Sequence, residues 1–423
     1  MKALLLAAGR SRRAKPIEDK NFLKFCGQTL IEFQIESLKK AGFTEVIIAA
    51  GEHNMESLQE VAAMHGATVI QQENLDDGMA GAILATKPHL NAEALFIVSS
   101  NDVVDSIAYE SVLKATESGA DAYLLAYQLD EYFPGGYLQV TDGKITDIVE
   151  KPGAGNEPSN MVNIVLHWFR KPETLFAELE KTTSDQDDRY EVALDTLMNS
   201  QRFEPVPYAG MWQPVKYPWH VLDLMPFFFE LMDAHIDPSA MIADSAIIKG
   251  NVRIEAGAKV FDNAVIQGPA YVGKNTIIAN NALVRGSVIG DDCVVGYSCE
   301  VARSFIGDDC WFHSNYVGDT VMGDNNSFGA GAVCANLRLD EKNIGESGRN
   351  KLGPILGNNI RVGVNTSIMP GVKIGSNTMI TSGLVVAQDI EPGKFVHGKT
   401  ELEIKENRAT LDETARQDMK DKL

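Results

Sequence analysis

Basic side chains gather just after the first apolar run of the sequence. The run over 3–8 leads into Gly9, and six basic and two acidic side chains follow between residues 10 and 24. A glycine after a strand lets the backbone approach phosphate oxygens, and arginine and lysine neutralise their charge. The stretch therefore predicts a phosphate-binding loop, with a solvated basic loop as the alternative.

Three further segments carry polar groups that a phosphorylated ligand could use. Residues 73–82 form a glycine-containing turn before a helical run, which suits backbone contacts with a nucleobase. Asp102 follows an apolar strand, where its carboxylate could hold Mg²⁺ against phosphates. Glu150 and Lys151 end another strand and offer an acceptor and a cation to a sugar phosphate.

One histidine in the second half of the chain could act as a base. His313 lies in the segment 310–342. Because the unperturbed pKa of histidine is near neutrality, its ring could take a proton from an amine or hydroxyl that attacks a thioester. A histidine at the surface or at a corner is the alternative.

Alternating strands and helices must position the first set of groups. Over 1–230, short apolar strands alternate with amphipathic stretches, which predicts a Rossmann-like α/β domain with a mostly parallel sheet. Ligands bind such sheets at the carboxyl ends of the strands. Strand-like runs between about 120 and 170 predict a sheet extension that forms one wall of the pocket. The expected strands are 3–8, 46–50, 68–71, 95–99, 121–127, 136–140, 145–150 and 161–169, and the expected helices are 29–41, 55–65, 80–90, 172–181 and 189–200.

A period of six residues replaces this alternation from Ile236 onward. Gly, Asn and Asp stand between the apolar positions, where tight corners need residues that tolerate positive φ. This pattern predicts a left-handed parallel β-helix of hexapeptide repeats, in which three hexapeptides make one coil. The polar segment 339–354 interrupts the pattern and should project from the coil. The first nine periodic positions are Ile236, Ile242, Ile248, Ile254, Val260, Ile266, Val272, Ile278 and Val284, and six more run from Leu356 to Val386.

The change of period divides the chain into two domains and a tail. We expect an α/β domain over 1–230, a β-helix over 236–398 and a charged tail over 399–423. The tail lacks a sustained apolar stripe, which favours a solvated helix or a disordered end over a partner-binding segment.

Composition limits the partners and the compartment. The 58 acidic and 38 basic side chains give a net charge of −20, which argues against nucleic acid or an anionic membrane as a partner. The five cysteines are odd in number and include no CxxC pair, which suits reduced thiols in a cytoplasm. Cys293 and Cys310 are expected to stack in adjacent coils and not to hold a metal.

The first half resembles the sugar-1-phosphate nucleotidylyltransferases. The resemblance rests on the ordered motifs named above, on Asn163, and on Trp212 followed by Tyr217-Pro218-Trp219. It implies attack of a sugar-1-phosphate on the α-phosphate of an NTP, with release of pyrophosphate. It also implies that Arg13 stabilises the leaving pyrophosphate and that Lys20 neutralises the nucleotide phosphates. The other implied ligand residues are Ala7, Ala8, Gly9, Gln72 and Gly78 for the nucleotide, Gly136, Glu150, Lys151 and Asn163 for the sugar phosphate, and Asp102 for Mg²⁺.

Two departures from this family matter. Ser11 and Arg12 replace the usual Gly and Thr or Ser, so the phosphate loop is more cationic. Pro214 replaces the usual second metal carboxylate, and a proline side chain cannot ligate a metal. Asp102 and the nucleotide phosphates then hold Mg²⁺ with extra waters, or another carboxylate serves, or this half is impaired; we expect the first.

The segment 310–342 resembles the acetyltransferase half of bifunctional glucosamine-1-phosphate acetyltransferase/N-acetylglucosamine-1-phosphate uridylyltransferases. The family pattern H-x-x-Y-x-G-D begins here at His313. The resemblance implies His313 as general base, Tyr316 and Asn336 on the sugar phosphate, and Lys342 on its phosphate. Acetyl-CoA would lie between coils of neighbouring subunits in a homotrimer. Arg285 and Arg303 are the nearest matches for the remaining basic residues, and the stretch after Asn336 differs from the usual Asn-Tyr-Asp-Gly, which leaves the amino sugar open.

These features lead to one main functional expectation and two alternatives. We expect nucleotidyl transfer from UTP or dTTP to a sugar-1-phosphate in the first domain, and acetyl transfer from acetyl-CoA to an amino-sugar-1-phosphate in the second. In the first alternative, the β-helix only trimerises or regulates a nucleotidylyltransferase. In the second, the chain is a non-catalytic nucleotide-sugar sensor.

Overall fold

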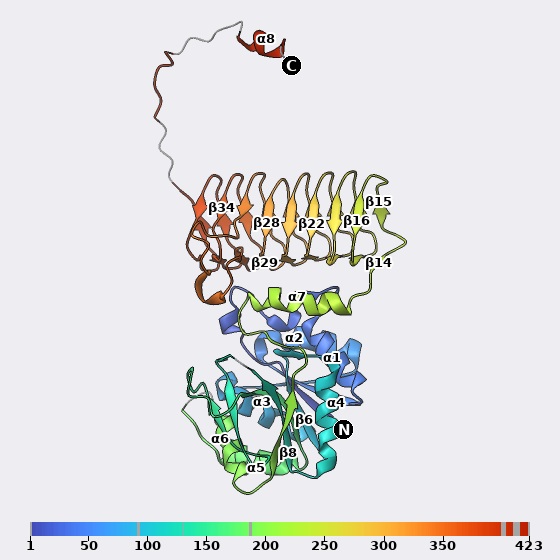
Figure 1. Ribbon diagram of the computed structural model, residues 1–423, viewed down its shortest axis with the longest axis vertical. Helices are drawn as coiled ribbons and strands as arrows, with labels where there is room; N and C mark the ends of the chain where they lie inside the picture. Colours follow the sequence, from blue (N-terminus) through green and yellow to red (C-terminus); the bar gives the residue numbers. More distant parts are fainter. Residues whose placement is uncertain are drawn as a thin grey trace.

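The structure is a computed structural model that describes residues 2–90, 94–129, 131–185, 188–398, 403–408 and 415–421. An α/β domain, the helix α7 (His220–Leu231) and a β-helix follow one another along the chain. Figure 1 shows α7 between the other two parts. No helix among the described residues is long and apolar enough to cross a membrane.

A nine-stranded mixed sheet forms the α/β domain, and its central path runs β10-β9-β11-β6-β1-β4-β5. β1 pairs in parallel with β4 and β6, whereas β11 runs antiparallel to β6, β8 and β9. Apolar side chains pack on both faces of the sheet. The strands are β1 (Lys2–Leu6), β4 (Glu45–Ala50), β5 (Thr68–Gln71), β6 (Leu95–Ser99), β8 (Ala122–Gln128), β9 (Gly136–Thr141), β10 (Lys144–Glu150), β11 (Met161–Phe169) and β12 (Phe203–Tyr208), and the helices are α1 (Leu30–Lys40), α2 (Met55–His65), α3 (Gly78–Thr86), α4 (Ser106–Ala115), α5 (Pro172–Lys181) and α6 (Arg189–Met198).

Each expected strand and helix of this domain is present, with ends shifted by a few residues. Helices α4 and α7 and strand β12 were not expected. Two small sheets were also missed: β2 (Lys24–Phe25) with β3 (Gln28–Thr29), and β7 (Asp102–Val104) with β13 (Trp212–Pro214). The second of these holds Asp102 and therefore bears on the site.

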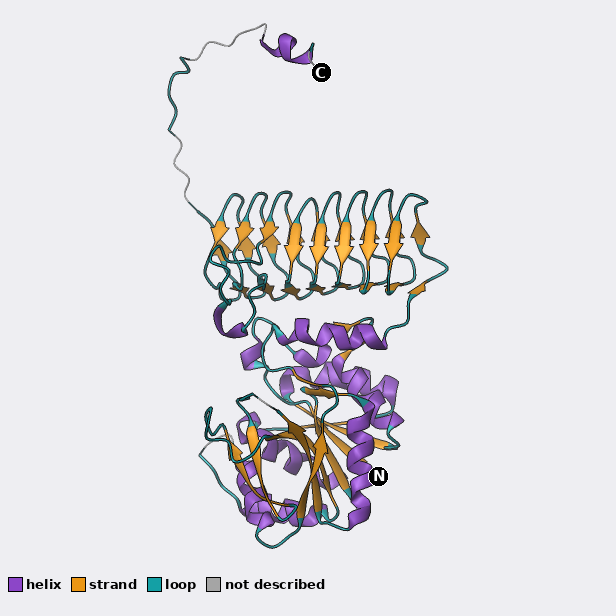
Figure 2. Cartoon of the chain, viewed as in Figure 1, coloured by secondary structure: helices purple, strands orange, loops and turns teal. Residues whose placement is uncertain are grey.

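Three parallel sheets make the triangular β-helix that the six-residue period predicts. Figure 2 shows their short strands stacked in a ladder. The second residue of most strands points inward, and these residues form one continuous apolar core. Asparagine and aspartate occupy many left-handed corners, such as Asn263 at φ 58° and Asp292 at φ 55°. The predicted fold class is thus confirmed, because the stacked parallel strands fit a left-handed β-helix.

We name the three sheets by face. Face 1 holds β14 (His235–Ile236), β17 (Val252–Ile254), β20 (Ala270–Val272), β23 (Val288–Ile289), β26 (Phe305–Ile306), β29 (Val321–Met322), β32 (Ile355–Leu356) and β35 (Lys373–Ile374). Face 2 holds β15 (Met241–Ile242), β18 (Lys259–Val260), β21 (Ile277–Ile278), β24 (Val294–Val295), β27 (Trp311–Phe312), β30 (Ser327–Phe328), β33 (Arg361–Val362), β36 (Met379–Ile380) and β38 (Phe395–Val396). Face 3 holds β16 (Ile247–Lys249), β19 (Val265–Gln267), β22 (Leu283–Arg285), β25 (Glu300–Ala302), β28 (Tyr316–Gly318), β31 (Val333–Cys334), β34 (Ser367–Ile368) and β37 (Val385–Val386).

The expected insertion leaves the coil between β31 and β32 and folds back on α7. Ile344 and Leu352 of this segment belong to the same buried apolar cluster as the inward side chains of α7. Arg349 bonds to Asp223 of the helix. Within the coils, the Cys310 amide donates to Cys293 Sγ at 3.4 Å, as expected for stacked positions. The tail contains the short helix α8 (Ala415–Lys420), and its remaining described residues, 403–408, form no regular element.

Candidate active sites

The basic loop begins where β1 ends, at the carboxyl edge of the sheet. The carbonyl of Ala7 accepts hydrogen bonds from Asn21 Nδ2 at 3.1 Å and from Asn54 Nδ2 at 3.0 Å, which fixes the start of the loop. Ser11 adopts the left-handed conformation at φ 50°, which is the conformation that glycine tolerates best. Its hydroxyl accepts from the Lys20 amide at 3.4 Å. The backbone path that glycine usually provides is thus kept at some conformational cost.

The proposed nucleotide residues lie on one side of this loop. Gln72 is buried and donates from Nε2 to the carbonyls of Asn74 at 2.8 Å and Gly78 at 3.0 Å. Gly78 opens α3 with φ 56°. Arg10 pairs with Asp76 at 2.6 Å and so ties the basic loop to the turn over 73–78. This ion pair places the basic loop beside the turn that leads to Gly78.

Asp102 stands at the centre of the carboxyl edge. Trp212 Nε1 donates to its Oδ1 at 3.0 Å. Burial raises the pKa of Asp102, whereas the Trp212 hydrogen bond and the ammonium groups of Lys216 and Lys20 lower it. Lys20 is itself buried and donates to the Val215 carbonyl at 2.7 Å. Burial lowers the pKa of Lys20 to about 8, against the opposing pull of Asp102.

Lys216, which the sequence analysis did not single out, lies among the predicted catalytic groups. Burial lowers its pKa; Asp102 and Glu150 oppose that shift, and the positive charges of Arg13 and Lys151 add to it. These four partners come from three segments of the chain, because Glu150 and Lys151 are adjacent, and all of them act electrostatically on Lys216. In the sequence, the one signal for Lys216 is its position two residues after Pro214, which departs from the family pattern.

The predicted sugar-side residues Gly136, Glu150 and Asn163 lie on β9, β10 and β11. Gly136 faces Glu150 across β9 and β10, and a Cβ at Gly136 would fall 2.8 Å from the Glu150 carboxylate. Asn163 Oδ1 lies 2.9 Å from Nε2 of His167, whose Nδ1 lies 2.8 Å from the Tyr190 hydroxyl. Burial lowers the pKa of His167 to about 3, so the ring is neutral and orients the Asn163 amide. The sequence analysis also missed His167.

The residues at this edge do not form a divalent-cation site by themselves. Pro214 is buried and directly opposes Asp102 in the β13–β7 pair. Among the described residues, no group of three or more His, Cys, Asp or Glu side chains could hold a metal ion. Asp102 thus supplies a single carboxylate, with one oxygen already bonded to Trp212. Its role as a magnesium ligand stays a prediction.

A second polar network lies on face 3 of the β-helix and at its corner with face 1. Arg303 donates to Asp319 through Nε and Nη2, both at 2.7 Å. Asn336 Nδ2 donates to the same carboxylate and to the Tyr316 hydroxyl, the latter at 3.1 Å. Asp319 is buried, so it holds Arg303 and Asn336 in fixed positions beside Tyr316. Three of the predicted acceptor residues therefore meet.

Other predicted residues of this half lie outside that network. His313 is exposed at the corner between β27 and β28, with its ring centroid 6.2 Å from that of Trp311. Arg285 pairs with Glu300 at 2.6 Å, one coil away from Arg303. Lys342 is exposed on the insertion. Among the described residues, none of these three side chains bonds directly to the Tyr316 network, although Glu300, the partner of Arg285, pairs in register with Tyr316.

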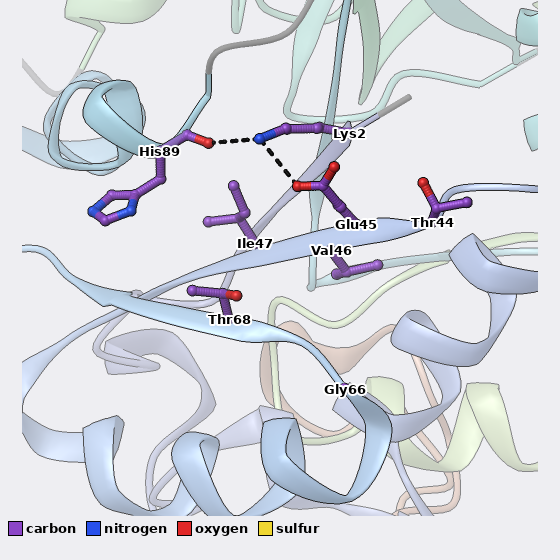
Figure 3. A pocket seen from close by; sticks show the side chains of 8 residues that line it. All are labelled: Lys2, Thr44, Glu45, Val46, Ile47, Gly66, Thr68 and His89. Atoms are coloured by element: carbon purple, nitrogen blue, oxygen red, sulfur yellow. Dashed lines mark hydrogen bonds and ion pairs between the residues drawn. The ribbon is translucent and has the colours of Figure 1, made fainter.

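Two cavities lie away from the Asp102 edge of the sheet. A polar pocket of about 270 Å³ lies at the amino ends of β1 and β4, where Lys2 pairs with Glu45 at 3.0 Å (Figure 3). It is therefore at the opposite edge of the sheet from Asp102. A second cavity of about 510 Å³ lies between α7 and the β-helix, and Phe229, Arg303 and Asp319 line part of it.

Comparisons with known proteins cover both halves of the chain. The family model of the MobA-like NTP transferase domain matches residues 3–225, and that of the GMPPB C-terminal domain matches residues 231–351. A bifunctional sugar-1-phosphate nucleotidylyltransferase/acetyltransferase of Sulfurisphaera tokodaii is 30% identical over 410 residues, which cover 93% of this chain and 99% of the relative. A bifunctional protein GlmU of Methanocaldococcus jannaschii is 32% identical over 417 residues, which cover 95% and 98%. Among solved structures, apo UDP-glucose pyrophosphorylase aligns with a TM-score of 0.47 and 18% identity, over 54% of this chain and 98% of that one.

Proposed function

Because the chain belongs to the family of bifunctional sugar-1-phosphate nucleotidylyltransferase/acetyltransferases, we propose that it joins an NTP to a sugar-1-phosphate and acetylates an amino-sugar-1-phosphate. Membership confirms the resemblance found in the sequence. UTP or dTTP is the proposed nucleotide, and acetyl-CoA is the acetyl donor. The cytoplasm and the homotrimer remain expectations.

Nucleotidyl transfer takes place at the carboxyl edge of the α/β sheet. A phosphate oxygen of the sugar-1-phosphate attacks the α-phosphorus of the NTP, and the bond to the bridging oxygen breaks so that pyrophosphate leaves. Arg13 stabilises the leaving group, Lys20 neutralises the nucleotide phosphates, and Glu150 and Lys151 hold the sugar phosphate. Such catalysis depends on alignment and charge neutralisation.

Acetyl transfer takes place on the β-helix. The amine nitrogen of the sugar attacks the thioester carbonyl while His313 accepts a proton from that amine. The proton then passes to the sulfur, and CoA leaves as the thiol. Tyr316 and Asn336 bind the sugar phosphate, with Arg303 and Asp319 fixing Asn336. In a trimer, a neighbouring subunit would bring its own His313 or Lys342 to this network.

One observation carries the nucleotidyl-transfer proposal: Arg13, Asp102 and the adjacent pair Glu150 and Lys151 come from three separate segments and act electrostatically on Lys216. The deciding experiment is a pyrophosphate-release assay. UTP, dTTP, ATP and CTP are each combined with the 1-phosphates of glucose, glucosamine, galactosamine and N-acetylglucosamine. We expect release with UTP or dTTP and one of these sugars, and no release from any pair would refute the proposal.

A parallel assay tests the second activity. Thiol release from acetyl-CoA is followed with glucosamine-1-phosphate and galactosamine-1-phosphate. We expect release with one of them. Pyrophosphate release without thiol release would instead favour a nucleotidylyltransferase whose β-helix only trimerises or regulates.

A further inference from the structure

The position opposite Asp102 carries no second carboxylate. Pro214 fills it, and backbone pairing between β13 and β7 sets the two residues directly across from each other. Asp102 Oδ1 accepts the indole N–H of Trp212 at 3.0 Å. A divalent cation would therefore find one carboxylate and a hydrocarbon ring where a pair of carboxylates would hold it more firmly.

Two packed aromatic rings, Phe133 and Trp212, hold the ammonium group of Lys216 on the same side as Asp102. The Nζ of Lys216 lies 4.2 Å from the ring centroid of Phe133, within cation–π range. Phe133 in turn packs edge-on against Trp212, with ring centroids 5.0 Å apart. Lys216 and Trp212 thus contact the same phenyl ring, and Trp212 also binds Asp102. The Lys216 ammonium group is therefore held near Asp102, on the side where Pro214 supplies no charge.

A second ammonium group flanks the same strand end. Lys20 Nζ donates to the carbonyl of Val215, the residue between Pro214 and Lys216, at 2.7 Å. Around Lys216 the nearby charges are those of Arg13 and Lys151 on the positive side and Asp102 and Glu150 on the negative side. With the two lysines included, together with Asp19, which acts on Lys20, positive charge still exceeds negative charge here, although the whole chain carries −20. Such a surplus suits a triphosphate.

We propose that the Lys216 ammonium supplies the positive charge that a protein-held divalent cation would otherwise supply, so that the NTP phosphates bind this chain without a resident metal. The inference rests on the proposed nucleotidyl transfer. Lys216 would contact the phosphates on the Asp102 side while Lys20 contacts them from the loop side. Bond making and breaking at the α-phosphorus stay as described above.

Binding to the unmodified full-length protein gives the first test. UTP affinity is measured by calorimetry in excess EDTA and again in Mg²⁺, without a sugar phosphate. We expect the two dissociation constants to agree within a few-fold. We also expect Mn²⁺ added to the nucleotide-free protein to keep the electron paramagnetic resonance spectrum of free Mn²⁺. Loss of UTP binding in EDTA, or stoichiometric binding of Mn²⁺, would overturn the proposal.

Variants give the second test. Lys216→Met should bind UTP in EDTA about 10- to 100-fold more weakly, the loss expected for one charge-assisted hydrogen bond. Lys216→Arg should recover most of the affinity, and Lys114→Met, on the exposed surface of α4, should not change it. Unchanged UTP affinity in Lys216→Met would also overturn the proposal. The wild-type measurement in EDTA decides the matter even if Lys216→Met does not fold.

Failure here is distinguishable from failure of the proposed function. UTP that binds in EDTA without any pyrophosphate release would refute nucleotidyl transfer and support the lysine's role in binding. Pyrophosphate release that occurs only with Mg²⁺, together with no UTP binding in EDTA, would support nucleotidyl transfer and refute the lysine's role.

Discussion

Arg303 is already paired within the protein, which limits what it can offer to a substrate. Its guanidinium makes two hydrogen bonds to Asp319, whose side chain is buried. Lysine keeps the charge but cannot reproduce the planar fork. We expect Arg303→Lys to lower the free energy of unfolding by about 1–2 kcal/mol, because Asp319 would lose one charge-assisted bond. We also expect a higher KM for the acetyl acceptor at similar kcat. Urea denaturation and thiol-release kinetics check both, and an unchanged KM would show that Arg303 has only a structural role.

His313 presents the opposite case, because its side chain is exposed and its ring centroid lies 6.2 Å from that of Trp311. General-base catalysis contributes about 10²- to 10⁴-fold. We expect His313→Ala to slow thiol release from acetyl-CoA by at least that lower factor, and to spare pyrophosphate release. His235→Ala, at an exposed position of β14, is the matched control. Equal thiol release in His313→Ala and wild type would remove His313 from the base role.

Residue-level prediction from sequence depends on a motif that names the residue present. Arg13, Asp102 and Glu150 were chosen from the sequence in this way, and their roles stay predictions. Lys216 could not, because its place depends on Phe133 and on strand pairing between segments about a hundred residues apart. A motif shows that Pro214 stands where relatives usually have a carboxylate. It does not show which neighbouring charged side chain takes over that role.

At the scale of elements, two aspartates meet where α6 packs against β10. Burial and the nearby Asp147 carboxylate raise the pKa of Asp195 from 3.8 to about 6, although the Ile148 amide donates to it at 3.1 Å. The folded chain therefore holds more protons than the unfolded chain between about pH 4 and pH 6. The free energy of unfolding must fall as pH rises through that window.

Replacing this carboxylate should remove the pH-dependent loss. We expect Asp195→Asn to raise the free energy of unfolding by about 1–2 kcal/mol at pH 8, since Asn keeps an acceptor for the Ile148 amide and carries no charge. The gain should vanish near pH 4, where Asp195 is protonated in wild type. Urea denaturation at both pH values measures it. Glu173→Gln, in the first turn of α5, is the control, and a gain that is equal at pH 4 and pH 8 would contradict the argument.

Periodicity predicted some elements and missed others for a physical reason. The six-residue repeat is visible because each inward side chain packs against identical neighbours above and below, so the pattern is local and repeated. Helix α7 has only Asp223 and Glu230 as acidic residues on its exposed face, and Pro226 and three consecutive phenylalanines obscure its helical period. Its buried residues pack between the α/β domain and face 1, so the apolar content of the helix reflects the tertiary arrangement.

The whole molecule is joined through α7 and face 1. Phe228 of the helix stacks on Phe25 of the α/β domain with ring centroids 4.6 Å apart, and Phe25 lies 5.0 Å from Phe305 of face 1. Lys24 adds ion pairs with Asp291 and Asp308 of the β-helix. The outward side chains of face 1 are accordingly buried at Val288 and its neighbours in the stack. Face 1 is thus occupied within one chain, which leaves faces 2 and 3 for other contacts.

Face 2 exposes large apolar side chains on several of its strands, with Ser327 and Arg361 between Trp311 and Met379, and we expect these side chains to contact neighbouring chains in a trimer. Trp311, Met379 and Phe395 are 52%, 56% and 66% exposed, which is more apolar surface than an isolated chain should leave in water on one face.

We expect light scattering to give three times 46.1 kDa for wild type and 46.1 kDa for the double variant Trp311→Glu/Met379→Glu. Because His313 stands two residues from Trp311, the monomer should lose thiol release but keep pyrophosphate release. Met64→Glu, which changes a methionine of α2 that is 71% exposed, should leave the mass unchanged. A wild-type mass of 46.1 kDa would exclude the trimer and would require one chain to complete the acetyl-transfer site alone.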